Sequence, residues 1–126
     1  MTPFEWLLCG HLVGDWLLQS DYEALNKGER WLPNITHVSK WTMSVAASAW
    51  VVGWRGEAGF LLWLLAMGVV HALVDRRWPT LWIIWLKERM PMARPKEARE
   101  PPMFLVFCVD QVVHILQVAV LAVILA

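Results

Sequence analysis

Histidine and aspartate recur in this sequence as three pairs, each with its two members four residues apart. The pairs are His11 with Asp15, His71 with Asp75, and Asp110 with His114. Residues four apart lie on the same face of a helix, so the two members of each pair can act together. Imidazole and carboxylate groups are ligands that Zn²⁺, Mn²⁺ and Fe²⁺ share. The spacing therefore points to a metal centre.

A divalent transition metal, zinc, manganese or iron, is the cofactor that we predict. It would neutralise carboxylates that apolar surroundings cannot solvate, and its bound water would attack a carbonyl or phosphoryl centre near neutral pH. The predicted ligands are the members of the three pairs: His11, Asp15, His71, Asp75, Asp110 and His114. The predicted catalytic residues are His37, as general base or further ligand, and Gln19 and Gln111, which would orient carboxylates or substrate. The residues predicted to contact an anionic substrate headgroup are Lys27, Arg76 and Arg77.

The segments that must position these residues are long and apolar. Of the 126 residues, 58% are hydrophobic and only 17% are charged, whereas a soluble domain carries roughly a quarter charged residues. Four stretches reach the length of about 20 residues that a helix needs to cross a bilayer, at 2–20, 35–54, 58–78 and 102–126. We therefore predict an all-α integral membrane protein, with a single transmembrane domain over 1–126 in which four transmembrane helices form a bundle.

The connection between the third and fourth stretches is predicted to contain a short interfacial helix over 80–90. Its apolar residues from Leu81 to Leu86 are too few to cross a membrane, so the helix would lie along the surface with Lys87 in the headgroups. A proline-rich stretch follows from 91 to 102.

The basic residues indicate an orientation for four spans. The first and third connections hold nine of the eleven Lys and Arg residues, whereas the opposite side holds only Arg55. Because Lys and Arg accumulate in cytoplasmic loops, both termini are predicted to lie on the non-cytoplasmic side. The His/Asp pairs then fall between the inner interface and the middle of the bilayer, where they can form one site open to the cytoplasm.

The same residues also have simpler explanations. A single buried His or Asp between helices often serves only as an interhelical hydrogen bond, and Arg76 and Arg77 are first of all topology signals. Three pairs at matching depth are harder to explain in that way, because ionisable groups at membrane depth are costly and usually functional. The net charge of zero gives no sign of a nucleic-acid partner.

Five short motifs in this order resemble the small bacterial membrane family numbered 3307 among the domains of unknown function, over nearly the whole chain. The motifs are the segment 11–21, Asn26 with Lys27, then His37, then His71 with Asp75 and Arg76, and finally Asp110 and Gln111 with His114. Trp41 stands where an aromatic residue such as Tyr is common in the family. The resemblance implies a polytopic protein of the bacterial inner membrane, and it implies no activity.

Three functions are compatible with these features. The leading one is a metal-dependent intramembrane hydrolase that acts on a lipid-linked or phosphate-bearing substrate from the cytoplasmic leaflet. The second is a component of proton or metal-ion transport, although the outer half of the bundle lacks polar residues to continue a path. The third is a non-catalytic subunit of a larger membrane complex, with His11 and His114 as candidate ligands of a haem or pigment. The expected partners are the lipid bilayer, a lipid-like substrate, and further copies of the chain or other subunits.

Overall fold

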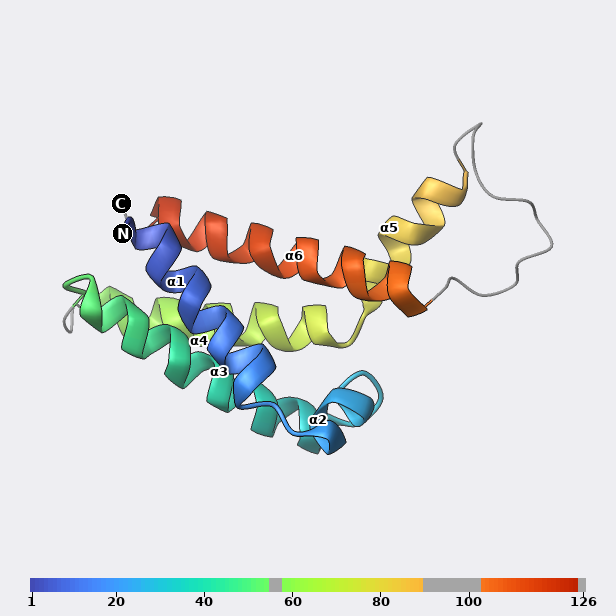
Figure 1. Cartoon of the computed structure of the whole chain (residues 1–126), viewed down its shortest axis with the longest axis horizontal. Coiled ribbons are helices and arrows are strands. Elements are labelled where there is room, and N and C mark those ends of the chain that lie inside the picture. Colours follow the sequence, from blue (N-terminus) through green and yellow to red (C-terminus); the bar gives the residue numbers. More distant parts are fainter. Residues whose placement is uncertain (55–57, 90–102, 125–126) are drawn as a thin grey trace.

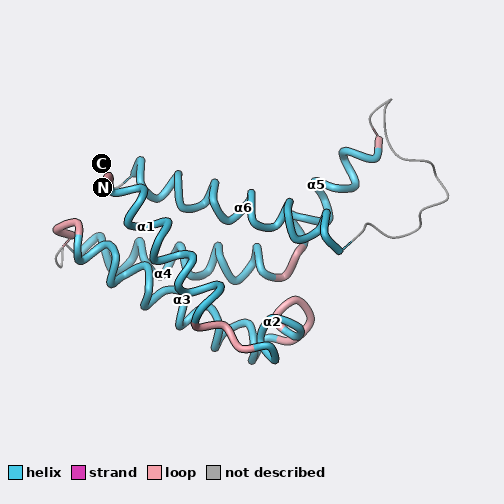
Figure 2. Tube along the Cα trace, in the orientation of Figure 1, coloured by secondary structure: helices cyan, strands magenta, loops and turns pink. Residues whose placement is uncertain are grey.

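A computed structural model of the chain describes residues 1–54, 58–89 and 103–124. Its elements are α1 (Pro3–Leu12), the π-helix η1 (Val13–Leu17), α2 (Asp21–Asn26), α3 (Trp31–Val51), α4 (Ala58–Asp75), α5 (Trp78–Glu88) and α6 (Met103–Ile124). Within the described ranges, Figures 1 and 2 show helices and short loops, with no strand. The all-helical prediction is therefore confirmed. The predicted proline-rich stretch at 91–102 and the last two residues of the predicted fourth span lie outside the described residues.

Two capping boxes divide the N-terminal segment. At the start of α1, the Thr2 hydroxyl accepts a hydrogen bond from the Glu5 N–H, and the Glu5 carboxylate accepts one from the Thr2 N–H at 2.6 Å. Ser20 and Glu23 repeat this arrangement at the start of α2. Because a capping box satisfies the free N–H groups at a helix start, Ser20 marks a new helix and not the continuation of the first.

Four helices close a ring around the core. Helix α1 packs against α3 and α6, and α4 packs against the same two helices. Neighbouring helices run in opposite directions, as Figure 1 shows. Two glycines let the N-terminal segment approach α3 closely: a Cβ atom on Gly10 would lie 2.8 Å from the Ser44 carbonyl oxygen, and one on Gly14 would lie 2.7 Å from Trp41 Cα. Any larger residue at either position would push the two elements apart.

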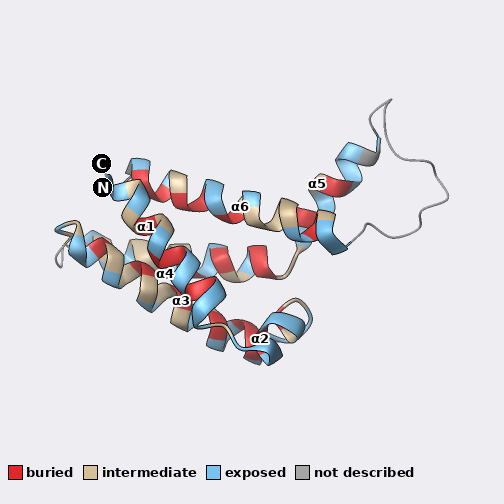
Figure 3. Cartoon of the chain, in the orientation of Figure 1, coloured by how far each residue is buried: buried red, intermediate tan, exposed pale blue. Residues whose placement is uncertain are grey.

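The core of this ring, whose buried residues are red in Figure 3, changes from apolar to polar along its length. Near the start of α1 and the end of α6 lies an apolar half, formed by Leu7, Trp41, Val45, Ala49, Val118, Leu121 and Ala122. Further along the same helices lies a polar cluster, formed by His11, Asp15, Lys27, His37, His71, Asp75 and His114, all buried. Trp41 stands at the boundary between the two.

The prediction of four membrane spans is wrong. Within the described ranges, only α6 is by itself long and apolar enough to cross a bilayer, and α4 with α5 reaches that standard only as a pair bent by 53°. The predicted span at 2–20 contains ten residues of α-helix and five of π-helix before the boundary at Ser20. The predicted span at 35–54 falls mostly in α3, which is long enough but too polar, because five Ser and Thr residues and Lys40 interrupt its apolar positions.

Two further predictions depend on those spans. The orientation compared two membrane sides that four spans would define, so it loses its basis; one or two helices compatible with a membrane remain. The helix predicted at 80–90 is present as α5, and it packs against α4 and α6. Arg77, at the bend between α4 and α5, has a φ of 61° in the left-handed region, a conformation that residues other than glycine seldom adopt.

Candidate metal centre

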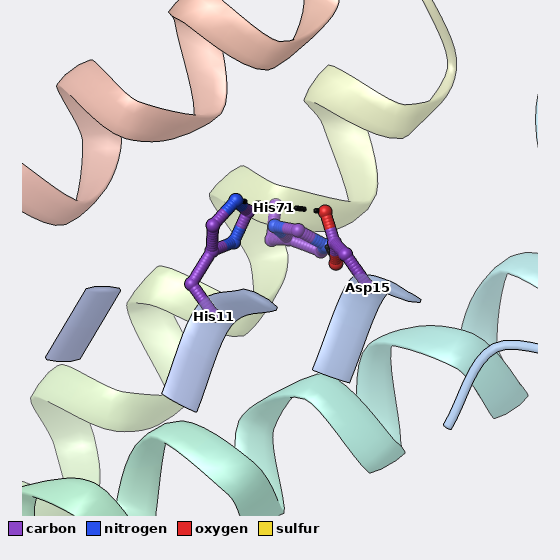
Figure 4. Close-up of side chains that lie close together, drawn as sticks. All are labelled: His11, Asp15 and His71. Atoms are coloured by element: carbon purple, nitrogen blue, oxygen red, sulfur yellow. Dashed lines mark ion pairs between the residues drawn. The ribbon is translucent and has the colours of Figure 1, made fainter. Parts of the chain in front are cut away.

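The polar cluster takes its histidines and aspartates from every side of the ring. The contributing residues are His11 of α1, Asp15 of η1, His37 of α3, His71 and Asp75 of α4, and His114 of α6, each at most 5% exposed. Figure 4 shows His71 reaching between His11 and Asp15. Asp15 lies in a π-helical turn, a feature that is frequent at functional sites. Side chains far apart in the sequence therefore converge, and five of the six members of the three His/Asp pairs are among them.

Two histidines and two aspartates form the centre of this cluster. Asp15 Oδ1 lies 3.3 Å from the Nε2 atoms of both His37 and His71. Asp75 Oδ2 lies 3.2 Å and 3.4 Å from the same two nitrogens, which are 3.3 Å apart. Atoms that bind one tetrahedral ion at about 2.0 Å stand about 3.3 Å from one another. The five separations thus match two ligand triangles that share the histidine pair.

Several polar atoms of the cluster lack hydrogen-bond partners in the described part of the chain, and a cation could take the place of such partners. Among the described residues, both oxygens of Asp15 and the Nε2 atom of His114 are buried and form no hydrogen bond of regular geometry. Buried polar atoms are nearly always partnered, because leaving them unpaired costs free energy. Carboxylate oxygens and imidazole nitrogens are satisfied together by a divalent transition metal, so the donor set fits the predicted cofactor.

Lys27 extends the cluster on the other oxygen of Asp75. Its Nζ atom lies 2.7 Å from Asp75 Oδ1 and 3.2 Å from His37 Nε2. The Nε2 atom of His114 lies 3.4 Å from the same Asp75 oxygen. Asp75 therefore faces the histidine pair with one oxygen, and Lys27 and His114 with the other. The lysine predicted to contact a headgroup is thus part of the cluster itself.

Other predicted residues surround this centre. Asp110 lies beside His114, with its Oδ2 atom 3.5 Å from His114 Nδ1. Gln19, with its amide oriented to suit its neighbours, accepts a hydrogen bond from Lys27 Nζ at 3.2 Å and donates one to the Asp15 carbonyl oxygen at 2.7 Å. Gln19 therefore holds the lysine and the backbone of the aspartate in place, as an orienting residue would.

A cavity of about 450 Å³ adjoins the cluster. Its polar lining consists of Asp15, Gln19, Lys27, Asp75, Arg77, Asp110 and Gln111, and its apolar lining of Trp16, Ala24, Met103, Val106 and Phe107. The volume lies within the range of ligand pockets, roughly 300–1,000 Å³, and the mixed lining suits an amphiphilic ligand. The two predicted headgroup arginines differ: Arg77 lines the cavity, whereas the Arg76 guanidinium lies over the Trp31 ring at 4.7 Å.

Burial and mutual contacts move the pKa values of the cluster in different directions. Burial lowers the pKa of His11 to about 4, and the attraction of Asp15 offsets only part of that change. Burial alone would raise the pKa of Asp15, but the imidazoles of His37 and His71, each 3.3 Å from Oδ1, hold it well below its usual range. Burial would lower the pKa of His37, but the two aspartates raise it above its usual value. Asp15 is therefore ionised, as a metal ligand must be.

Trp41 is the residue of the site that the sequence reasoning missed most clearly. Its indole N–H donates a hydrogen bond to His11 Nδ1 at 2.8 Å, and its ring stacks on His71 with centroids 4.0 Å apart. Its position four residues after His37 places both on one face of α3. That spacing from His37 could have indicated that Trp41 belongs to the site. It was overlooked because a tryptophan in an apolar segment is usually read as a packing residue.

Asn34 and Thr80 were also missed. The Asn34 amide donates to the Lys27 carbonyl oxygen at 3.2 Å and to the Ala72 carbonyl oxygen at 3.0 Å, so it ties the Lys27 loop to α4. The Thr80 hydroxyl donates to Asp110 Oδ1 at 3.1 Å. Both are fully buried. Asn34 lies three residues before His37, which again places it on the site face of its helix.

Fold and site together define a class of protein: an all-helical ring with a buried His/Asp centre beside a cavity of mixed polar and apolar lining. A family model described as "Protein of unknown function (DUF3307)" matches residues 4–126, and the chain belongs to this family. The family predicted from the motifs is therefore confirmed. No curated protein and no solved structure matches the chain. The family description names no activity.

Proposed function

We propose that this protein is a metal-dependent hydrolase that works at a membrane and acts on an amphiphilic substrate, either phosphate-bearing or lipid-linked. The observation that carries this proposal is the pair of ligand triangles: Asp15 and Asp75 each face the His37 and His71 nitrogens at 3.2 to 3.4 Å. These separations lie close to the spacing of about 3.3 Å between ligand atoms around a tetrahedral ion.

The residues around the centre have distinct roles in this proposal. Asp15, His37, His71 and Asp75 would hold a zinc, manganese or iron ion, which when bound supplies a Lewis acid and an acidified water. Lys27 lines the cavity and is fixed by Asp75, so its ammonium is held where it can face an anionic group of the substrate. Arg77 offers a second cationic contact at the cavity wall.

The apolar surface of the described helices supports association with a membrane. Only 28% of the apolar window of α6 is buried within the protein, whereas the core helix of a soluble protein is largely covered. Large apolar side chains are exposed elsewhere too, among them Leu62 at 71% and Trp82 at 61%. We place the protein in the bacterial inner membrane with α6 as the segment that enters the bilayer. The exposed Trp16 and Phe107 at the cavity would then meet the apolar part of the substrate.

Metal analysis of the purified full-length chain in detergent tests the proposal directly. We expect about one tightly bound divalent transition metal per chain, and its loss in Asp15→Ala and in His71→Ala. Asp21→Ala, at an exposed position at the start of α2, is the matched control and should keep the wild-type metal content. Metal-dependent release of phosphate from a long-chain alkyl phosphate in mixed micelles should follow the same order of variants.

Two results would contradict the proposal. Absence of any bound transition metal, or wild-type metal content in both site variants, would remove the metal centre. Metal or proton flux into liposomes, lost in the same variants and unaccompanied by hydrolysis, would replace the hydrolase with a transport component.

A further inference from the structure

The hydrogen-bond partners of two histidines in the cluster fix where their ring hydrogens lie. His114 Nδ1 stands 2.8 Å from the Asp110 carbonyl oxygen. A carbonyl oxygen only accepts, so Nδ1 carries a hydrogen, and the neutral ring presents its lone pair at Nε2. That nitrogen faces Asp75 Oδ1 at 3.4 Å. A backbone carbonyl on one ring nitrogen is the usual way in which a metal-binding histidine is oriented.

His11 has the opposite arrangement. Its Nδ1 atom accepts a hydrogen bond from the Trp41 indole N–H at 2.8 Å. An indole nitrogen can only donate, so His11 Nδ1 carries no hydrogen, and the ring hydrogen must lie on Nε2. The Nε2 atom faces Asp15 Oδ2 at 3.7 Å. The side of His11 that points into the cluster is therefore a donor.

We propose that His11 does not bind the metal but is a positioning residue, which presents an N–H group to Asp15 Oδ2 and leaves Oδ1 for the ion, with Trp41 fixing its tautomer. This inference rests on the proposed metal-dependent function. For His11 to become a ligand, its hydrogen would have to move to Nδ1, where it would meet the Trp41 N–H head to head. Both ring systems are fully buried, so the lost hydrogen bond would have no replacement from water.

The assignment gives the two oxygens of Asp15 separate tasks. Oδ1 stands 3.3 Å from both ligand histidines, and Oδ2 is turned toward His11. The electrostatic attraction between Oδ2 and the His11 N–H, at 3.7 Å, opposes rotation of the carboxylate and so favours Oδ1 at the metal position. His11 thereby connects Trp41, at the edge of the apolar half, to the centre of the polar cluster.

Nitrogen-15 NMR of the imidazole rings tests this inference, and the chain suits the method because it contains only four histidines. The full-length protein, ¹⁵N-labelled and carrying a purification tag without histidine, would be studied in detergent before and after one equivalent of Zn²⁺. We expect the His11 ring to carry its hydrogen on Nε2 in both spectra. The Nε2 signals of His37 and His71 should move to zinc-bound positions, whereas both His11 nitrogens should stay unbound.

A hydrogen on His11 Nδ1, or a zinc-bound shift of His11 Nε2, would overturn the inference. Failure of the metal function gives a different result: no ring would respond to Zn²⁺, while the tautomer of His11 would still be readable. His11→Gln should weaken zinc binding roughly 10- to 100-fold without changing its stoichiometry, whereas His71→Ala should abolish it. A change of stoichiometry in His11→Gln would again contradict the positioning role.

The conservative variant Trp41→Phe separates the indole N–H from the bulk of the ring. It keeps an aromatic ring against His71 but removes the donor to His11, so a second tautomer of His11 should appear in the spectrum. Trp82→Phe, at a position 61% exposed on α5, is the matched control and should leave the His11 signals unchanged. An unaltered single tautomer in Trp41→Phe would show that Trp41 does not set it.

Discussion

The two halves of the core are built on the same helices by opposite physical means. In the apolar half, Leu7, Val45 and Leu121 are at most 2% exposed and contribute burial that depends on volume and shape. In the polar cluster, side chains equally buried carry charge, and burial acts against them unless each finds a partner. The apolar half therefore stabilises the fold. The polar cluster costs free energy on burial, and the surrounding helices keep it buried by placing its charged groups beside partners.

The buried charges of the polar cluster need counter-charges. Its two central carboxylates, Asp15 and Asp75, lie near a single lysine, Lys27, whose ammonium is 2.7 Å from Asp75 Oδ1. The remaining negative charge can be balanced by protonated imidazoles of the cluster or by a divalent cation. The apolar half has no such requirement. Changes in the apolar half should therefore alter stability alone, whereas changes in the polar cluster should alter both metal binding and stability.

The largest effect should come from Asp75→Asn, because this one residue faces His37, His71, His114 and Lys27. Removing its charge takes away a ligand and leaves Lys27 buried without a counter-charge, which typically costs about 3–5 kcal/mol. We expect zinc affinity to fall by at least about 100-fold and the unfolding temperature to drop. Titration calorimetry and thermal unfolding in detergent measure the two effects. Asp21→Asn is the exposed control, and equal zinc affinity in both variants would contradict the assignment.

Leu7→Ala tests the other half. Leu7 is fully buried in the apolar half, and truncation to alanine should lower the free energy of unfolding by about 2–5 kcal/mol through lost burial and the cavity left behind. Zinc affinity of the folded protein should stay within a few-fold of wild type. Leu62→Ala, at a position 71% exposed, should have little effect on unfolding. If the free energy of zinc binding to folded Leu7→Ala fell by more than its free energy of unfolding, the two halves would be coupled.

The sequence allowed more of the apolar architecture to be predicted than of the site. Long apolar runs placed the helices at 35–54, 58–78 and 102–126 close to α3, α4 and α6, because hydrophobic periodicity is a local property. The predicted number of spans was wrong because it rested on the length of the apolar stretches. It did not take into account the Ser and Thr residues that make α3 too polar, or the capping box at Ser20 that starts a new helix. The position of Lys27 inside the cluster depends on a loop held by Asn34 to α4, a contact 38 residues apart that no local pattern encodes.

A smaller effect should come from Gly14→Ala, at the boundary of the two halves. The added Cβ atom would lie 2.7 Å from Trp41 Cα, so η1 and α3 must separate, at a cost of about 1–3 kcal/mol. The Trp41–His11 hydrogen bond should weaken with the separation. Gly59→Ala is the matched control, because no atom lies within 4 Å of its Cβ position; it should stabilise α4 slightly. Equal unfolding temperatures for the two variants would contradict the close approach.

The smallest effect is expected outside both halves, at the ion pair between Glu23 and Lys40. Burial alone would raise the pKa of Glu23, but the Lys40 ammonium at 2.7 Å and the donors of Ser20 lower it to about 2, from an ordinary value of 4.5. A depressed pKa in the folded state contributes stability above pH 4.5 that is lost as the pH falls toward 2. The difference in unfolding free energy between wild type and Glu23→Gln should therefore be about 1 kcal/mol or less at neutral pH, as for partly exposed ion pairs, and shrink in acid. Lys40→Met should reduce the same pH-dependent component, and a difference that grows in acid would have the wrong sign for this pair.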